Sequence, residues 1–187
     1  LHIANDVPGA KNPYDINLTA RSTPDISVEQ AITVIADGGT KGFGTLFRYD
    51  PATNRYEVMV NFTGTTGAAL GSRANGRLHL DENDVVWGTT EVGGTGNSGT
   101  VFKFDPTTRV FTTIHSFNLG GNGGYPRSGL VDGGDGFLWG TASSSPGGVI
   151  YRVNKSTSTL GVAYAFPSSP NTEGTSPEGD LVLDGAG

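Results

Sequence analysis

GTVFKFDP at residues 99–106 is the middle one of three related stretches in this chain. GTLFRYDP precedes it at residues 44–51, and the looser copy GVIYRVNK follows it at residues 148–155, so the spacings are 55 and 49 residues. A period of this size is typical of arrays, solenoids and propellers, in which each copy supplies one small structural unit. The repeat therefore governs the interpretation of the whole chain.

Other runs recur at the same offsets. VMVNF at residues 58–62 returns as TIHSF and then VAYAF, and VWGTT at residues 86–90 returns as LWGTA. Each copy holds four short runs of strand-forming residues bounded by Gly-rich turns, which predicts four strands per copy. In order within the copy, the predicted strands are residues 31–36, 85–90 and 137–142 (first); 45–50, 100–105 and 149–154 (second); 56–62, 111–117 and 160–166 (third); and 77–80, 130–132 and 181–184 (fourth).

Alternation along a strand predicts which side chains share a face. In the second run Phe102 and Phe104 share a face and Val101 points the other way, and the other copies match. In the third run one face is expected to carry Tyr56, Val58, Val60 and Phe62 in the first copy, and the equivalent residues later. Both faces are apolar, so each sheet is expected to be covered on both sides, as blades are in a β-propeller.

The turns and loops have distinct compositions. Asp50-Pro51 and Asp105-Pro106 predict type I turns that close hairpins between the second and third strands, and Asn154 takes the Asp position in the third copy. The longest polar loops join the third strand to the fourth, at residues 63–75, 118–127 and 167–179. Any binding specificity is expected in such loops.

Composition narrows the classes of partner. The 187 residues include 30 Gly, 10 Pro and no Cys, and the net charge is −6. An acidic chain without a Lys/Arg run disfavours a nucleic acid or an anionic membrane as partner. No stretch approaches the roughly 20 apolar residues of a membrane helix. Disulfides and thiolate metal sites are excluded because cysteine is absent.

The first 29 residues do not follow the repeat. They hold two short alternating runs, residues 14–20 and 25–29, separated by a Ser-Thr-Pro break. Residues 1–29 are therefore predicted to be the end of another β-domain and a linker, and residues 30–187 to be three propeller-type repeats. Because the pattern begins and stops within a unit, we expect these repeats to be part of a longer array.

The repeat resembles a known family. GT-[LV]-F-[RK]-[YF]-D-P, a segment ending in HSF, a Gly-rich loop and DGFLWGT are similar to the GloVer (Gloeo-Verruco) tandem repeat of bacterial choice-of-anchor surface proteins. The resemblance covers residues 31–187 and is clearest at residues 99–117 and 129–141, whereas the first copy has Ile32, Thr33 and Val34 in place of Trp-Gly-Thr. PYDINLTA and PDISVEQ in residues 1–29 resemble the end of a choice-of-anchor D domain, an immunoglobulin-like sandwich.

The resemblance implies an all-β, extracellular or cell-surface bacterial protein and no particular reaction. We therefore expect a non-catalytic structural or binding module, for adhesion, surface assembly or glycan binding, and no cofactor. The alternative is a propeller lyase or hydrolase acting on a polysaccharide or ester, which would need convergent His, Tyr or carboxylate groups in its central loops. Three blades are too few for a closed ring, so closure is expected from further blades or by self-association.

One charged column recurs in the second strand and gives the candidate binding residues: Arg48, Lys103 and Arg152. A ring of cations could bind an acidic sugar or a carboxylate, with Arg binding in bidentate fashion. The alternative is that each cation lies over apolar neighbours and pairs with a nearby acid.

For the other candidate functional residues, a role in packing or in turns is the better explanation. Packing accounts for His79 and His115, because both lie in columns of apolar residues in the other copies. The matched Trp87 and Trp139 are expected in the core, although tryptophan can stack on sugar rings. The carboxylates at residues 81–84 and 132–135 lack the spacing of a calcium loop, so no metal site is predicted.

Overall fold

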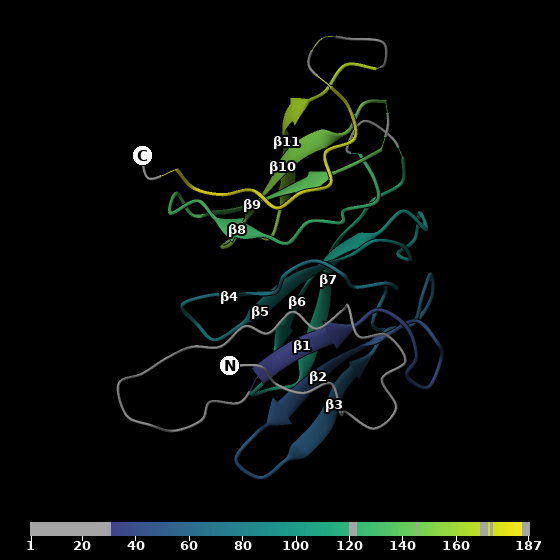
Figure 1. The fold of residues 1–187 in the computed structure, drawn as a ribbon, viewed down its shortest axis with the longest axis vertical. Coiled ribbons are helices and arrows are strands. Elements are labelled where there is room, and N and C mark those ends of the chain that lie inside the picture. The colour runs from purple at the N-terminus through teal and green to yellow at the C-terminus, as the bar shows by residue number, and fades with distance from the viewer. Residues whose placement is uncertain (1–30, 120–122, 145, 169–171, 173, 185–187) are drawn as a thin grey trace.

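The computed structural model of the chain describes residues 31–119, 123–144, 146–168, 172 and 174–184. These residues form strands joined by turns and loops, and they include no helix that could cross a membrane. The strands make three antiparallel sheets, which follow one another along the chain and along the long axis of the molecule (Figure 1). The prediction of an all-β fold is confirmed for this part of the chain.

The sheets are numbered in chain order. Sheet 1 contains β1 (Ala31–Ile35), β2 (Thr45–Asp50) and β3 (Arg55–Asn61). Sheet 2 contains β4 (His79–Leu80), β5 (Val86–Thr90), β6 (Thr100–Asp105) and β7 (Val110–Ser116). Sheet 3 contains β8 (Val131–Asp132), β9 (Phe137–Ala142), β10 (Val149–Asn154) and β11 (Leu160–Ala165). Each strand pairs with the next one along the chain, so every sheet is a meander.

The first three strands predicted for each copy are confirmed to within one residue at either end. The predicted grouping is wrong for the fourth run, because β4 and β8 pair with the first strand of the next copy. The short turns at residues 81–85 and 133–136 let the chain reverse directly into that strand, whereas a long loop separates each fourth run from its own copy. Residues 181–184 form no strand.

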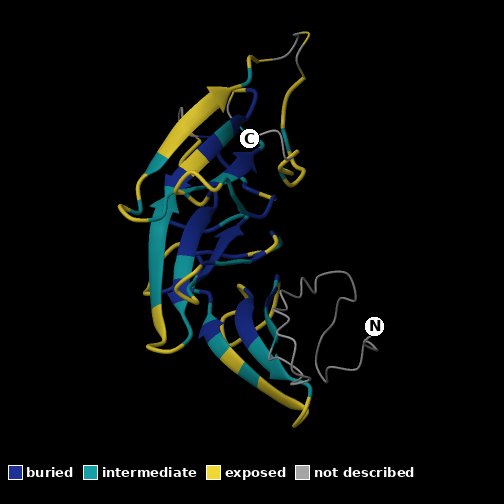
Figure 2. Cartoon of the chain, turned by 90° about the vertical axis from the view of Figure 1, so that its left-hand side faces the viewer, coloured by how far each residue is buried: buried dark blue, intermediate teal, exposed yellow. Residues whose placement is uncertain are grey.

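Two apolar cores join the three sheets. The first lies between sheets 1 and 2 and includes Leu46, Phe62 and Phe102. The second lies between sheets 2 and 3 and includes Trp87 and its neighbours on β6, β9 and β10. Sheet 2 is therefore covered on both faces, as predicted. Figure 2 shows the consequence, because β5 and β6 of sheet 2 are mostly buried whereas β11 at one end of the stack is mostly exposed.

A β-bulge interrupts the alternation of the third strand in every sheet. In sheet 2, Val101 pairs with His115 and Phe102 with Thr113, so Ile114 is the extra residue. Equivalent shifts occur in the other two sheets, with Met59 as the extra residue in β3 and Ala163 in β11. A bulge puts two residues opposite one and turns the following side chains to the other face.

The bulge overturns the expectation that one face carries the alternate residues of the third strand. Phe111, before the bulge, stacks on Phe102 in the core shared with sheet 1, whereas Phe117, after it, is buried against sheet 3. The prediction fails in the same way in the first copy, for Tyr56, Val58, Val60 and Phe62. The third strand of sheet 2 thus helps to cover both neighbouring sheets.

The glycine of Trp-Gly-Thr makes room for an aromatic ring. A Cβ atom at Gly88 would lie 2.6 Å from Cζ of Phe102, its cross-strand partner. A Cβ atom at Gly140 would likewise lie 2.6 Å from the hydroxyl oxygen of Tyr151. In sheets 2 and 3 the motif therefore couples β5 and β9 to the aromatic residue of the neighbouring strand.

The hairpin turns confirm the role predicted for Asp and Asn. Asp50 accepts hydrogen bonds from the amides of Ala52 and Thr53, and Asp105 accepts the equivalent bonds in sheet 2. Asn154 does the same in sheet 3 through its side-chain oxygen. Self-capping of this kind fixes the register of each hairpin.

Candidate binding groove

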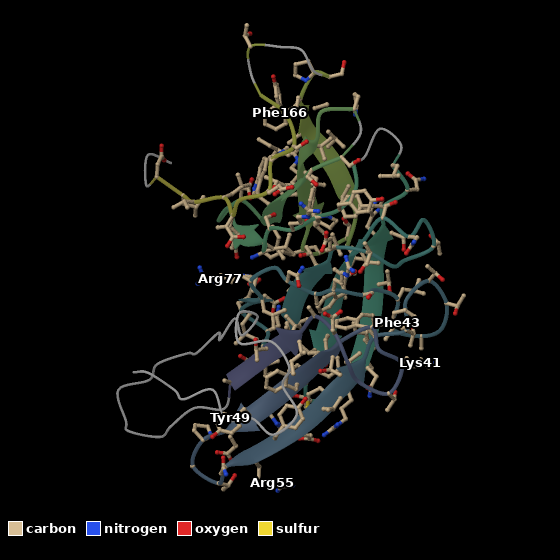
Figure 3. The ribbon with its side chains drawn as sticks, turned by 45° about the vertical axis from the view of Figure 1, so that its right-hand side comes forward. Lys41, Phe43, Tyr49, Arg55, Arg77 and Phe166 are labelled. Atoms are coloured by element: carbon tan, nitrogen blue, oxygen red, sulfur yellow. The ribbon has the colours of Figure 1, made fainter. Side chains whose placement is uncertain are left out.

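A groove forms where the fourth-run segments of the three copies approach one another. Its volume is about 460 Å³, and it is lined by residues 77–82, 129–132 and 180–181. These three segments are equivalent positions of three consecutive copies. Figure 3 shows Arg77 projecting from this side of the molecule, away from the sheets. The groove is therefore a product of the repeat and not of one loop.

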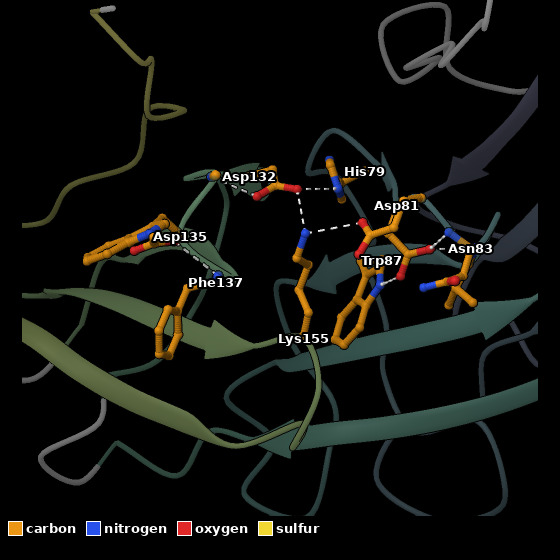
Figure 4. A network of polar contacts seen from close by, with 12 residues as sticks. His79, Asp81, Asn83, Trp87, Asp132, Asp135, Phe137 and Lys155 are labelled. Carbon is orange, nitrogen blue, oxygen red and sulfur yellow. Dashed lines mark hydrogen bonds and ion pairs between the residues drawn. The ribbon is translucent and has the colours of Figure 1, made fainter. Parts of the chain in front are cut away.

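A polar network occupies one wall of the groove (Figure 4). Nζ of Lys155 donates hydrogen bonds to Oδ2 of Asp132 at 2.8 Å and to Oε2 of Glu82 at 3.2 Å. Nε2 of His79 lies 3.8 Å from the same Asp132 oxygen. Because Lys155 comes from the β10–β11 turn and Glu82 from the β4–β5 turn, the network connects sheet 2 to sheet 3.

The network sets the charges of its members. Burial lowers the pKa of His79, and this effect outweighs the opposing charge of Asp132, so the imidazole is neutral near pH 7. Burial alone would raise the pKa of Asp132, but the hydrogen bonds from Lys155 and from the Gly134 amide lower it overall. The hydrogen bond to Asp132 raises the pKa of Lys155. The groove thus contains a permanent ion pair beside a neutral histidine.

His79 is the one member of this network that has an unsatisfied polar atom. Its Nε2 is buried and makes no hydrogen bond to any residue that the structure describes. The other groove acids are already engaged: Asp81 accepts a hydrogen bond from the Trp87 indole at 2.8 Å, and Asp180 accepts one from the Gly129 amide at 2.6 Å. Of these lining residues, Arg77 and Glu82 are exposed at the groove, whereas the Nε2 atom of His79 lies beneath its surface.

Each cation of the recurring column has a structural partner. Lys103 lies over the ring of Trp87, with Nζ 5.4 Å from the centroid, and also donates to the Ser158 hydroxyl. The guanidinium of Arg152 lies over the rings of Phe137 and Trp139, at 4.5 and 5.6 Å. These contacts do not bring the cations together at one site.

Arg48 has no tryptophan beside it and pairs with an acid instead. Its cross-strand neighbour on β1 is Ile32, and its guanidinium donates to Oε2 of Glu57 at 2.6 Å. Arg109 from sheet 2 contacts the same carboxylate, and the two arginines lower the pKa of Glu57. A ligand-binding role for Arg48, Lys103 and Arg152 stays a prediction, since nothing in the structure tests it.

The remaining candidates lie where packing explains them. Trp87 is buried in the core between sheets 2 and 3, and Trp139 is partly exposed at the equivalent place on sheet 3. His115 packs edge-on against Phe117, with ring centroids 4.9 Å apart, and burial lowers its pKa. Asp135 accepts hydrogen bonds from Phe137 and Trp139. Within the described residues, no cluster of acids and histidines is arranged to hold a metal ion.

Sequence reasoning did not find the groove or the role of Lys155. The groove depends on the fourth run pairing with the following copy, and that pairing is not visible in the pattern of a single copy. One signal was available: Leu78, Leu130 and Leu181 recur at a spacing of 52 and 51 residues, each beside a small or charged residue. That recurrence indicates that the three segments occupy equivalent places.

The repeat and the stacked meanders define a tandem-repeat all-β protein. A sequence model of the Gloeobacter/Verrucomicrobia repeat matches residues 32–187, so the chain belongs to that repeat family. The resemblance to the GloVer repeat is thereby confirmed. The immunoglobulin-like end predicted for residues 1–29 lies outside the described residues, and the choice-of-anchor assignment stays a prediction.

Comparison with solved structures shows a distant likeness to TolB from Acinetobacter baumannii. The TM-score is 0.42 and the sequence identity 13%, over 71% of this chain and 29% of the TolB chain. The chain therefore spans less than a third of the length of that protein. No curated protein matches the sequence.

Proposed function

We propose that this chain is a non-catalytic repeat module of an extracellular or cell-surface bacterial protein, with its sheets arranged as propeller blades. The observation that carries the proposal is the uniform stacking of the sheets. Sheet 2 presents Phe102 and Phe104 to the preceding sheet and Trp87 and Val101 to the following one. Sheet 3 presents the equivalent Tyr151 and Val153 to sheet 2.

The propeller arrangement is supported by the positions of the edge strands. β4 and β8 are the first strands of their sheets, and both border the groove together with residues 180–181. In a propeller the first strands of the blades surround the central axis. We propose that further blades, or a second copy of the chain, complete the ring around this groove.

A non-catalytic role is supported by the state of the polar groups. The contact between Lys155 and Glu82 links sheet 3 to sheet 2, and Asp132 holds the Lys155 ammonium in place, which is a structural task. His79 lies 3.8 Å from the Asp132 carboxylate. The described residues that line the groove include no Ser, Thr or Tyr that could act as a nucleophile beside this pair. The arrangement suits binding of a polar ligand, such as a surface glycan, better than acid–base chemistry.

Binding assays test the proposal. The chain is applied to a glycan array and to bacterial surfaces, beside a groove variant carrying Arg77→Glu and Glu82→Ala, both at exposed positions. Lys41→Ala, in an exposed loop outside the groove lining, is the matched control. We expect binding by the wild type and the control and its loss in the groove variant.

Two results would contradict the proposed function. If both assays find no binding, the module is a spacer and its binding role is wrong. If a panel of polysaccharides and esters reveals turnover that His79→Gln or His115→Gln abolishes, the module is an enzyme.

A further inference from the structure

The outward face of sheet 3 is the equivalent of faces that are covered in sheets 1 and 2. Phe62 and Phe117 end the third-strand segments of the first two units and are fully buried, whereas Phe166 is partly exposed in the third. Figure 3 shows Phe166 at one end of the molecule. Leu46 and Val101 are also fully buried, but the equivalent Ile150 is not.

The tryptophan column shows the same difference. Trp87 is 1% exposed because sheet 3 covers it, whereas Trp139 on sheet 3 is partly exposed. Tyr164, which corresponds to His115, is 44% exposed. The face of sheet 3 therefore presents the residue types that form a sheet-to-sheet core elsewhere in this molecule, without such a cover from the described residues.

The segment after sheet 3 already lies where the first strand of another sheet would begin. Thr89 donates its hydroxyl hydrogen bond to the carbonyl of Ser128, the residue that precedes the β8 segment, and Thr141 donates the equivalent bond to the carbonyl of Gly179. Pro126 packs against Gly99, and Pro177 packs against Gly148 in the same manner. Residues 177–179 thus repeat the contacts of residues 126–128.

This segment exposes apolar side chains instead of pairing. Val182 is 86% exposed and Leu183 is 58% exposed. By position Val182 corresponds to His79 and Val131, which pair with Trp87 and Trp139 respectively. An exposed apolar segment of this kind is suited to pairing with another strand.

We propose that the outward face of sheet 3 docks a further sheet of the same repeat family, whose first strand is residues 181–184. The inference rests on the stacking described under the proposed function and not on ligand binding in the groove. Continuity with the two existing interfaces identifies the occupant. The outward face of sheet 3 carries Ile150, Trp139 and Phe166, which are the equivalents of residues that form the covered face of sheet 2. The docked sheet would present an aromatic residue at the position of Phe102 and Tyr151, and an apolar residue at the position of Phe104 and Val153.

The occupant also has a defined polar contact. Lys103 lies over Trp87 and donates to the hydroxyl of Ser158, which belongs to the turn of the covering sheet. Arg152 lies over Trp139 in the equivalent place. The turn residue of the docked sheet that corresponds to Ser158 is therefore expected to lie beside Arg152, as Arg109 approaches Arg48 through their shared partner Glu57 between sheets 1 and 2.

An extended protein tests this inference. The full chain is continued after Asp184 with a second copy of residues 82–119, which supplies the three strands that follow β4 in sheet 2. Trp87→Phe in both copies leaves Trp139 as the single tryptophan. Docking is expected to shift Trp139 emission to the blue, to reduce acrylamide quenching several-fold, and to slow amide exchange at residues 181–184.

The matched control carries Phe102→Ser and Phe104→Ser in the added copy only. It keeps the length and turns of the extension but lacks the docking face, so Trp139 should remain as accessible as in the unextended chain. If the unaltered extension leaves Trp139 equally accessible while its far-ultraviolet circular dichroism shows a gain of β structure, the inference is wrong.

A second readout covers the case in which the added copy does not fold on its own. Ile150→Ser should reduce the urea midpoint several-fold more in the extended protein than in the unextended chain, because only docking covers Ile150. Equal effects in both proteins would contradict the inference. The glycan-binding assay of the groove variant does not depend on docking at sheet 3. Failure of docking and failure of the proposed function are therefore distinguishable.

Discussion

The matched tryptophan and the matched cation of the repeat are cross-strand partners. Trp87 lies opposite Lys103, and Trp139 lies opposite Arg152. Two columns that look independent in the sequence are thus one aromatic–cation pair, which contributes about 0.5–1 kcal/mol where it is exposed to solvent. In the first copy the tryptophan is replaced by isoleucine, and the cation binds an acid instead.

The indole of Trp87 is fixed by one carboxylate. Asp81 accepts hydrogen bonds from the indole at 2.8 Å and from the amides of Asn83 and Val85 at 2.9 and 3.0 Å. Asp81→Ala should lower the free energy of unfolding by about 3 kcal/mol, because three donors lose their acceptor and the indole is buried. Urea denaturation measures the change.

Asp135→Ala is the control for this prediction. Asp135 bonds to the Trp139 indole at a longer 3.4 Å and is exposed, so its removal should cost less than about 1 kcal/mol. Equal losses of unfolding free energy in the two variants would contradict the idea that burial of the indole makes the Asp81 hydrogen bond more important.

Tyr151 is an exception within its column. The equivalent residues are Phe47 and Phe102, and the buried hydroxyl of Tyr151 makes no hydrogen bond to any described residue. Burial raises its pKa, so the hydroxyl stays protonated. Tyr151→Phe should therefore raise the unfolding free energy by about 1 kcal/mol, as measured by thermal or urea denaturation. A loss of stability would mean that the hydroxyl has a partner.

The two half-buried histidines make stability depend on pH. Burial lowers the pKa of His79 and of His115 below the ordinary value of 6.5, which applies in the unfolded chain. The unfolded state then binds protons more readily, so stability is complete above about pH 6.5 and falls as the pH drops from there toward the folded-state pKa values. Urea midpoints at about pH 7.5 and about pH 5.5 should show this loss.

The double variant His79→Gln, His115→Gln should show a smaller loss over the same range. His2 remains in both proteins and serves as an internal constant. An unchanged pH dependence would contradict the assignment of the effect to these two side chains.

At the scale of the strand, the β-bulge is the feature that determines packing. It lets the first half of β7 face sheet 1 and the second half face sheet 3, so that one strand contributes to both cores. The bulge occurs in all three sheets, which makes it part of the repeat and not a local irregularity.

Deleting Ile114 tests the bulge. Without the extra residue, Phe117 would turn away from the core between sheets 2 and 3, and the loss should resemble that of a buried Phe→Ala substitution, about 3–5 kcal/mol. Ile114→Val keeps the bulge and should cost only about 1 kcal/mol. Thermal denaturation of both variants measures the difference, and similar melting temperatures would contradict the account.

Strands and turns could be predicted from the sequence because they depend on local chemistry. The Asp and Asn turns and the nine strands from the first three runs follow from residue type and alternation. The bulge could not be predicted, because VMVNF is apolar at four of five positions, so its side chains could pack on either face of the sheet. The groove depends on pairing between copies. Lys155 binds the groove residues Asp132 and Glu82 from a turn whose equivalents, Pro51 and Pro106, carry no charge.

At the scale of the molecule, the sheets are stacked by one repeated operation. Each sheet turns the same face toward its predecessor, so the interfaces are heterologous and the stack has two unlike ends. A stack of this kind ends only where it closes on itself or where a face is otherwise covered. The two ends of the described stack, β3 and β11, accordingly hold several of its exposed large apolar side chains: Tyr56, Val58, Val162 and Tyr164.

Hydrogen–deuterium exchange resolved by strand tests the stacking most directly. β6 and β10 occupy the same place in their sheets, each paired on both edges, but β6 is covered on both faces and β10 on one. Amides of β6 should exchange at least about tenfold more slowly than those of β10, a difference of about 1.4 kcal/mol in opening free energy. Equal protection of the two strands, or faster exchange in β6, would contradict the conclusion that sheet 2 lies between its two neighbours.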